Sequence, residues 1–477
     1  MSIKIANEKN LIQENDLSIF FIGSNKKVKF KEKALEALKE EFEPTCCNIE
    51  LNKIYTEDKF LNVMFVGLGN DENLSMDEIR NIGGDISRKL KKMKSKKVSF
   101  LNIEEYLNKD HVKALVEGLE LGAYDFTKYI TSNETDKEIV INLGLNESFI
   151  DSINEGELLA QMTLVSRSLV NEPANVIYPA TLGYEVVELG KTFGFETEIY
   201  GKQEIENLGM DAFLEVAKGS DKEPKLIVMR YFGDKNSEDI LGLVGKGLTY
   251  DSGGYSIKPT NSMVDMKTDM GGAGAVIGAM CGIAKAKLNK NVIAVVAACE
   301  NLISGNAYKP GDIINSMGKK TIEILNTDAE GRLTLIDAVY YAINKEKANK
   351  VVDIATLTGA AVVALGDVAT PVLTNNEEFY TLLDEAAKTS GEKIWRMPVF
   401  DEYKKVLKGK QADLNNSPGR DGGCITAGLF IGEFVGDTPW IHMDIAGTSV
   451  SAKESGYKSK GATGEGARTL YNLTKLI

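Results

Sequence analysis

The chain has 477 residues, of which 43% are hydrophobic and 26% charged, an ordinary balance for a globular protein of two or three domains. Its 69 acidic residues outnumber its 56 basic residues, and the formal charge of −13 argues against a general binder of nucleic acid or of anionic membranes. No apolar run reaches the roughly 18 residues of a transmembrane helix, and the N-terminal segment lacks the apolar core of a signal peptide, so we expect a cytoplasmic protein.

Histidine and cysteine are too sparse for several common catalytic sites. The chain has 2 histidines and 5 cysteines, and no two cysteines have Cys-x-x-Cys spacing, so neither a disulfide framework nor a thiolate zinc site is indicated. His442 lies in an apolar run and is expected in the core, whereas His111 is expected at the surface. A Ser-His-Asp or Cys-His mechanism is therefore disfavoured, and any metal site must rely mainly on oxygen ligands.

Residues 1–150 predict a small N-terminal α/β domain. Short apolar runs alternate there with charged segments of helical periodicity. The predicted strands are 17–22, 61–68, 98–103 and 139–143, and the predicted helices are 31–41, 76–93 and 111–124. This half contains no cluster of potential ligands, so we expect a structural or assembly role for it.

A second, larger domain is expected after a linking helix at 151–175. The helical stretch 155–170 leads to Pro173, which should end the helix because the residue before a proline disfavours helical geometry. In the remaining residues, 176–477, continuous apolar runs alternate with helical patterns, as in a parallel sheet covered on both faces. These runs are 225–229, 240–244, 291–297, 350–355 and 440–445. The expected fold class is α/β, with a small N-terminal domain and a larger C-terminal domain whose mostly parallel central sheet is flanked by helices.

The segment 321–333 brings three charged side chains to a junction between a strand and a helix. An apolar strand pattern at 321–325 is followed by a turn with Asp328, Glu330 and Arg332, and then by an amphipathic helical pattern. Ligands bind at the carboxyl ends of strands in open α/β sheets, and a helix N-terminus stabilises anions. The turn is therefore either a ligand site or a solvated turn that happens to be charged.

Further charged residues interrupt glycine-rich segments. Lys246 and Asp251 lie in an apolar run, where an unpaired charge is costly, so each should be paired or bound to a metal. That run lacks the spacing of a phosphate-binding P-loop. Asp269 precedes a small-residue helix at 273–287 and either serves as a ligand or caps that helix. The segment 353–360 either lines a substrate cleft or simply ends a strand.

Together these residues favour a metal-dependent hydrolase. Four carboxylates at strand ends would repel one another unless divalent cations lay between them, and more than three suggests two ions and hydrolysis through a bridging water. They are Asp251, Asp269, Asp328 and Glu330. Lys246 would be a ligand only as a neutral amine, whereas Lys258 would be a free cation that stabilises an oxyanion. No histidine is nearby by motif, so the chain itself offers no general base.

The octapeptide Asn-Thr-Asp-Ala-Glu-Gly-Arg-Leu at 326–333 resembles the signature of the leucyl aminopeptidase family, the cytosol-aminopeptidase type of di-metal exopeptidase (peptidase family M17). The resemblance covers the whole second domain, whereas the N-terminal domain matches only in general style. The other matching segments are 171–175, 208–210, 217–220, 245–259, 266–272, 298–308 and 461–464.

This resemblance implies two divalent metal ions per subunit, manganese or zinc, with magnesium or cobalt as further options. One ion would be held by Lys246, Asp251, Asp269 and Glu330. The other would be held by Asp251, Asp328 and Glu330. Asp251 and Glu330 would bridge the two ions together with the nucleophilic water.

The resemblance also assigns roles to residues around the metals. Lys258 would bind the scissile carbonyl oxygen, and Arg332 would hold a bicarbonate ion that acts as the general base. The implied substrate-binding residues are Met266, Asn326, Thr356, Leu357, Gly359 and Ala446. Tyr250 stands where phenylalanine is usual, and Tyr255 where a smaller residue is usual, so both bear on side-chain preference rather than on activity.

The implied activity is release of leucine-like residues from peptides with a free N-terminus, whose α-amine would ligate a metal. The family also implies a homohexamer. Two alternatives remain open: a Cys-Gly dipeptidase in thiol turnover, and a relative with an added DNA-binding regulatory role, which the charge of −13 disfavours.

Overall fold

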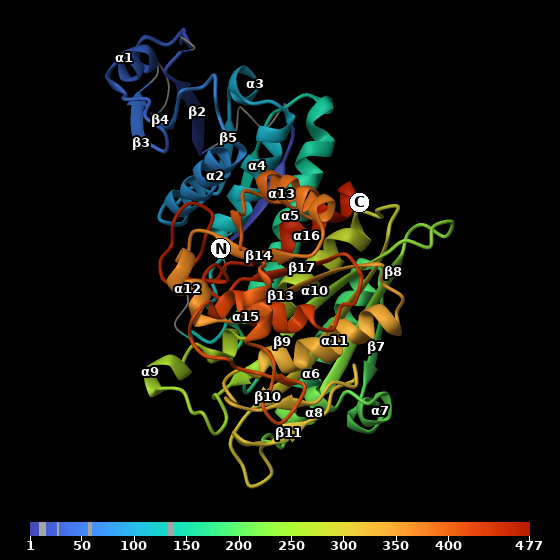
Figure 1. Ribbon diagram of the computed structural model, residues 1–477. Coiled ribbons are helices and arrows are strands. Elements are labelled where there is room, and N and C mark those ends of the chain that lie inside the picture. The colour runs from blue at the N-terminus through green and yellow to red at the C-terminus, as the bar shows by residue number, and fades with distance from the viewer. Residues whose placement is uncertain (9–15, 26–27, 56–59, 132–137) are drawn as a thin grey trace. The chain divides into compact units, whose positions relative to one another are not determined.

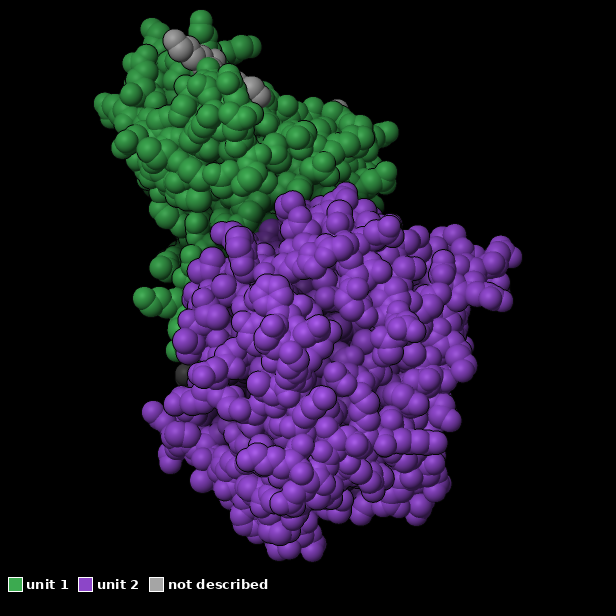
Figure 2. All heavy atoms as spheres, viewed as in Figure 1, with its two compact units in different colours: residues 1–161, 452–460 green, residues 162–451, 461–477 purple. Residues whose placement is uncertain are grey.

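A computed structural model describes residues 1–8, 16–25, 28–55, 60–131 and 138–477. The chain divides into two compact units, which Figure 2 colours separately. Unit 1 comprises residues 1–161 and 452–460, and unit 2 comprises residues 162–451 and 461–477. None of the helices in the described ranges combines the length and the apolar character that a membrane crossing requires.

Unit 1 is built on a six-stranded sheet in the order β1-β6-β5-β2-β4-β3, in which only the β3–β4 pair is antiparallel. Its strands are β1 (Ser2–Ala6), β2 (Leu17–Gly23), β3 (Ile49–Tyr55), β4 (Phe60–Gly69), β5 (Lys97–Phe100) and β6 (Glu138–Asn142). Its helices are α1 (Lys33–Glu41), α2 (Met76–Lys91), α3 (Ile103–Tyr106) and α4 (Lys109–Ala123). Helix α2 packs on α4 and begins at a capping box formed by Ser75 and Glu78. Helix α5 (Ile150–Asn171) begins in unit 1 and ends in unit 2, just before Pro173.

Unit 2 is built on an eight-stranded sheet in the order β15-β14-β17-β13-β9-β10-β8-β7. The central strands β17, β13, β9 and β10 run parallel, whereas the β14–β17, β10–β8 and β8–β7 pairs are antiparallel. The strands are β7 (Glu196–Tyr200), β8 (Lys225–Phe232), β9 (Ile240–Asp251), β10 (Asn291–Asn301), β13 (Lys350–Ala355), β14 (Thr370–Thr374), β15 (Ile394–Arg396) and β17 (Trp440–Asp444). The central strands are buried along nearly their whole length, which explains their continuous apolar sequences.

Helices cover both faces of this sheet (Figure 1). Val244 of β9 belongs to the same core cluster as residues of α11, whereas the next residue, Gly245, faces α10, because successive residues of a strand point to opposite faces. The helices of unit 2 are α6 (Pro179–Phe193), α7 (Lys202–Leu208), α8 (Asp211–Ala217), α9 (Thr260–Met263), α10 (Gly271–Lys285), α11 (Gly331–Asn344), α12 (Gly359–Leu365), α13 (Glu377–Ser390), α14 (Asp401–Lys405), α15 (Gly423–Gly432) and α16 (Ala467–Leu476).

Helix α10 lies unusually close to the sheet because glycines meet at the contact. A Cβ atom on Gly272 would lie 2.0 Å from the carbonyl oxygen of Ile354, and one on Gly245 would lie 2.6 Å from the carbonyl oxygen of Gly272. Both distances are far below van der Waals contact, so any larger residue would push the helix away from β9 and β13. The small-residue helix expected from the sequence thus packs with its backbone directly on the two central strands.

The expected fold class is confirmed, and one predicted element near the site is wrong. The strand predicted at 321–325 is reduced to β12 (Ile322–Glu323), which pairs with β11 (Ile313–Ile314) and β16 (Leu414–Asn415) in a small separate sheet. The ladder stops because the backbone N–H of Leu325 donates to the side chain of Asn416 at 2.8 Å. Two further short strands, β18 (Val450–Ser451) and β19 (Gly461–Ala462), form a pair of their own.

Candidate metal centre and substrate cavity

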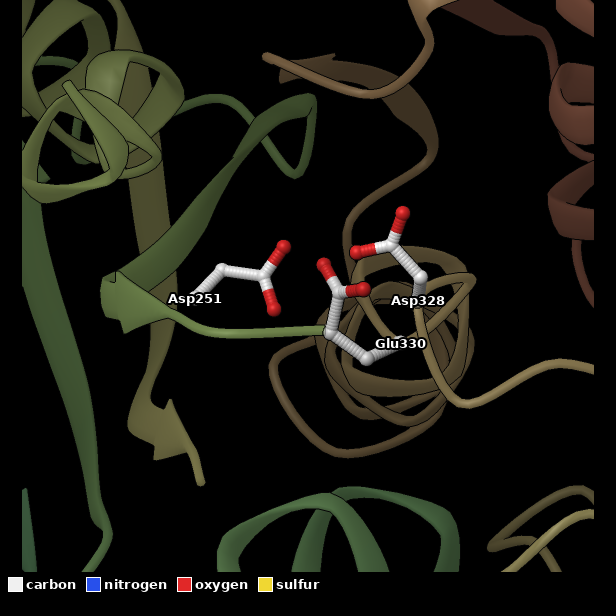
Figure 3. Close-up of side chains that lie close together, drawn as sticks. All are labelled: Asp251, Asp328 and Glu330. Carbon is white, nitrogen blue, oxygen red and sulfur yellow. The ribbon is translucent and has the colours of Figure 1, made fainter. Parts of the chain in front are cut away.

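Three carboxylates from separate parts of unit 2 converge at the carboxyl end of the central sheet. Asp251 is the last residue of β9, and Asp328 and Glu330 lie in the turn before α11. Each offers a carboxylate oxygen, and these atoms all lie within 4.8 Å of one another. Figure 3 shows the three carboxylates turned toward one another. In the turn, Glu330 is 2% and Arg332 8% exposed, whereas the Asp328 side chain is 32% exposed, so the segment 326–333 is largely buried rather than a solvated turn.

Lys246, on β9, is a buried cation beside this group. Its Nζ atom lies 2.8 Å from Asp269, 2.9 Å from Glu330 and 2.9 Å from the carbonyl oxygen of Thr356. Although burial opposes the charge, Asp269, Glu330 and Asp251 together raise the pKa of Lys246 above its ordinary value. The side chain reaches this position because residue 331 is glycine, where a Cβ would lie 2.4 Å from Lys246 Cε.

Asp269 is drawn into the same cluster and does not cap α10. The N-cap of α10 is Met270, with no side-chain capping bond. Asp269 instead contacts Lys246 and accepts a hydrogen bond from Thr356 Oγ1 at 2.8 Å. Burial is the main reason that the pKa of Asp269 rises to about 8, despite the neighbouring lysine.

Lys258 is a second cation, and it contacts Asp251 and Asp328. Its Nζ atom lies 2.8 Å from Asp251 Oδ2 and 2.5 Å from Asp328 Oδ1. The turn that delivers it contains Gly253, whose φ of 87° belongs to the left-handed region that suits glycine. A Cβ on Gly253 would also lie 2.8 Å from Asp328 Oδ1, so the turn can approach the carboxylates only without a side chain there.

The donor set fits divalent cations. Burial raises the pKa of Asp251 to about 6 and also raises the pKa of Asp328, which shows that the protein alone does not fully compensate these charges. Burial also acts against ionised Glu330, but Lys246 and Lys258 hold its pKa below the ordinary value. Glu330 Oε2 is buried and accepts no hydrogen bond from the described residues. Carboxylate oxygens gathered around an unpartnered acceptor are the ligands that hard divalent ions use.

Arg332 lies in the first turn of α11 and is nearly buried. One guanidinium nitrogen donates to the carbonyl oxygen of Asn416 at 2.7 Å, whereas Nε has no partner among the described residues. Burial lowers the pKa of Arg332 to about 10, although Glu330 and Asp444 oppose this. The buried guanidinium therefore keeps a donor available for an anion.

A cavity of about 460 Å³ opens beside the charged cluster. All five candidate metal ligands and Lys258 line it, and so do five of the six candidate substrate-binding residues: Met266, Thr356, Leu357, Gly359 and Ala446. Asn326 and Arg332 are not among the lining residues. Asn326 accepts a hydrogen bond from the backbone N–H of Asp328 at 2.8 Å, so it shapes the turn that carries this carboxylate.

Two asparagines that support the cluster were missed by sequence reasoning. Asn301, the last residue of β10, donates through Nδ2 to Asp251 Oδ1 at 2.8 Å. Asn416 accepts from Leu325 N–H and donates to the carbonyl oxygen of Asn326 at 2.6 Å. The pairing of β9 with β10, which sets Asn301 opposite Asp251, was a usable signal for the first. Nothing in the sequence near Asn416 indicated the second.

Comparisons with known proteins agree with this geometry. The family model described as "Cytosol aminopeptidase family, catalytic domain" matches residues 164–471, and the model of the N-terminal domain of the same family matches residues 29–133. Proteins named "Probable cytosol aminopeptidase" are similar over most of the chain. The one from Clostridium perfringens is 54% identical over 428 residues, covering 88% of this chain and 87% of the relative.

Two further relatives with the same name extend the comparison. The protein from Clostridium tetani is 49% identical over 429 residues, covering 88% of each chain. The protein from Bacillus subtilis is 43% identical over 424 residues, covering 87% of this chain and 84% of the relative. With the catalytic-domain model spanning all the candidate ligands, the chain belongs to the cytosol aminopeptidase family.

Proposed function

We propose that this protein is a metal-dependent aminopeptidase that hydrolyses the N-terminal peptide bond of peptides and prefers leucine-like residues. The observation that carries the proposal is the convergence of Asp251, Asp328 and Glu330 within 4.8 Å at the wall of a 460 Å³ cavity. That cavity lies within the residues matched by the family's catalytic domain. A cavity of this size suits a small ligand such as one terminal residue and the bond that follows it.

The cluster would hold two divalent ions. Lys246, Asp251, Asp269 and Glu330 would hold one, and Asp251, Asp328 and Glu330 the other. When bound, the ions supply the positive charge that activates a water for attack on the peptide bond. Lys246 is fully satisfied as an ammonium by three acceptors, so its role as a ligand requires loss of a proton when the ion enters. Manganese and zinc are the leading candidates, with magnesium and cobalt as alternatives.

Two cationic side chains, Lys258 and Arg332, would act on the substrate and on proton transfer. Lys258 contacts Asp251 and lines the cavity, where its ammonium would bind the scissile carbonyl oxygen and stabilise the negative charge that develops on it. Arg332 is nearly buried and its Nε has no partner in the part of the chain that the structure describes, which fits an anion holder. We propose that the anion is bicarbonate and that it serves as the general base.

The decisive experiment is a substrate panel assayed with each metal added to chelator-stripped protein. We expect leucyl substrates to be cleaved fastest with manganese or zinc, blocked N-termini to be resistant, and chelator to abolish activity. Absence of hydrolysis of any unblocked aminoacyl substrate by metal-loaded protein would contradict the proposal. A Cys-Gly substrate in the same panel tests the dipeptidase alternative, which would require Cys-Gly to be turned over faster than Leu-Gly.

We also propose a cytoplasmic homohexamer without nucleic-acid or membrane partners. The formal charge of −13 supports the absence of nucleic acid. Light scattering should give about six times the single-chain mass of 52.1 kDa. A gel-shift assay at low salt, where phosphate-driven binding is strongest, should show no retarded DNA.

A further inference from the structure

Asp444 lies where two strands that lead to the cavity separate. It is the last residue of β17, it is fully buried, and it stands opposite Ala355, the last residue of the parallel neighbour β13. One more bond, from Ile445 N–H to the carbonyl oxygen of Ala355 at 2.8 Å, joins the two segments. Beyond this point the chain after β13 forms one part of the cavity wall, and the chain after β17 reaches Ala446 in another part.

The carboxylate of Asp444 connects these two parts of the wall. Its Oδ1 accepts from the backbone N–H groups of Leu357 at 3.0 Å, Thr358 at 3.4 Å and Ala446 at 3.2 Å. Its Oδ2 accepts from the hydroxyl of Thr358 at 2.7 Å. Four donors from the two segments therefore converge on the two oxygens of one side chain. Leu357, Thr358 and Ala446 all line the cavity, whereas Asp444 does not.

The short segment 356–358 links Asp444 to the charged cluster. Thr358 is the N-cap of α12, and its hydroxyl oxygen accepts from Ala361 N–H at 3.0 Å while it donates to Asp444. Two residues earlier, Thr356 contacts Lys246 through its carbonyl oxygen and Asp269 through its hydroxyl. The segment 356–358 is thus fixed on one side by the cluster and on the other by Asp444.

We propose that Asp444 is a positioning residue that sets the shape of the substrate wall and thereby the selectivity for the N-terminal side chain. This inference rests on the proposed aminopeptidase function. Asp444 acts by holding Leu357, Thr358 and Ala446 at fixed separations across the strand gap. Charged hydrogen bonds of this kind are worth more than neutral ones, so their loss should loosen the wall measurably.

The test compares Asp444→Asn with Asp353→Asn. Asp353 is also fully buried and lies on β13, but its partners Trp440, which donates through Nε1 at 2.6 Å, and His442 do not line the cavity. We expect Asp444→Asn to raise KM for a leucyl substrate about tenfold and to reduce the leucyl-over-alanyl preference about threefold, with a smaller change in kcat. Asp353→Asn should leave the preference unchanged, because its partners are side chains within the core.

Amide hydrogen exchange on the metal-loaded protein gives a readout that does not need activity. In Asp444→Asn, the amides of Leu357, Thr358 and Ala446 should exchange about tenfold faster than in the wild type, and in Asp353→Asn they should not. Unchanged exchange at these amides, or an equal loss of preference in Asp353→Asn, would overturn the positioning role. An inactive wild-type protein would instead contradict the proposed function.

A second pair of variants covers the case in which Asp444→Asn does not fold. Thr358→Ser keeps the hydroxyl that donates to Asp444 Oδ2, whereas Thr358→Val removes it at nearly constant volume. We expect the valine variant to lose part of the wild-type leucyl-over-alanyl ratio and the serine variant to lose less of it. Equal ratios in both variants would also overturn the proposal.

Discussion

Arg80 and Glu117 in unit 1 form a buried pair of one cation and one anion, with Nε 2.8 Å from the carboxylate. At the cavity of unit 2, four carboxylates are gathered around two lysines, Lys246 and Lys258. Burying an uncompensated charge costs several kcal/mol, so a fold that keeps an excess of buried carboxylates either protonates some of them or offsets their charge with a bound ligand. Arg80 and Glu117 therefore form a structural ion pair, whereas the cluster at the cavity carries an excess of negative charge that a bound cation would offset.

The largest effect is expected from Asp251→Asn, which removes one of the excess charges. Because burial raises the pKa of Asp251 to about 6, folding disfavours its ionised form. The free energy of unfolding of metal-free protein should therefore rise at pH 7, by up to about 3 kcal/mol for a pKa raised from 3.8 to about 6, as measured by denaturant titration in chelator. With metal present, kcat/KM should fall about 10³-fold, because this residue would bridge both ions.

The opposite result would remove the distinction between the ion pair of unit 1 and the cluster at the cavity. If Asp251→Asn destabilised the metal-free protein by several kcal/mol and kept its activity, the cluster would be structural. Asp239→Asn is a suitable control, since this exposed acid precedes the same strand at its other end and should change neither quantity.

A smaller loss of activity is expected from Arg332→Ala. Removal of the anion holder should lower kcat about 10²-fold and abolish any stimulation by added bicarbonate, since general-base catalysis contributes on this scale. Both metals should stay bound, because the guanidinium of Arg332 donates to the carbonyl oxygen of Asn416, which is not a candidate metal ligand. Elemental analysis of the purified variant measures this, and loss of either ion would contradict the assigned role.

Glu117→Gln should act on stability alone. The change removes the buried carboxylate beside Arg80 and leaves the partly exposed Asp77, 3.2 Å from Arg80 Nη1, as its charged neighbour. We expect the free energy of unfolding to fall by about 3 kcal/mol, with kcat/KM of the folded protein unchanged. The double variant Arg80→Met with Glu117→Leu should recover most of the loss, because it removes both buried charges. A large effect of Glu117→Gln on kcat/KM would show that the two kinds of charge cluster are not separate.

The smallest effect concerns Glu120 of α4, a unit 1 carboxylate that lacks a cation. Burial, with a contribution from Glu157, raises the pKa of Glu120 to about 8. The folded state thus holds its proton more tightly than the unfolded state, so stability falls as pH rises from about 4.5 to about 8 and then levels off. Glu120→Gln should remove this slope and raise the midpoint of thermal unfolding at pH 8. The exposed Glu147→Gln is the matched control, and an unaltered slope in Glu120→Gln would contradict the assignment.

The sequence predicted the central strands and the charged residues better than it predicted their supports. Continuous apolar runs mark strands that are buried on both faces, and charges such as Lys246 and Asp251 stand out inside them. Asn301 and Asn416 carry no charge, and their roles depend on which strands and loops become neighbours. The short strand β12 was overestimated for the same reason, because a side chain from a distant loop takes the N–H of Leu325 that a longer ladder would have used.

The close contact between α10 and the strands β9 and β13 bears on the proposed metal affinity. The backbone of Gly272 packs directly against the backbone of Ile354 and Gly245. No flexible side chain lies between these backbones that could change conformation and let them shift. Lys246 follows Gly245 on β9 and Asp269 immediately precedes the helix, so the spacing of these two side chains is established when the domain folds. If these two side chains hold an ion as proposed, the ion would meet a site that needs little reorganisation. Discrimination among ions of different radius would then depend on backbone packing several bonds away from the ion itself.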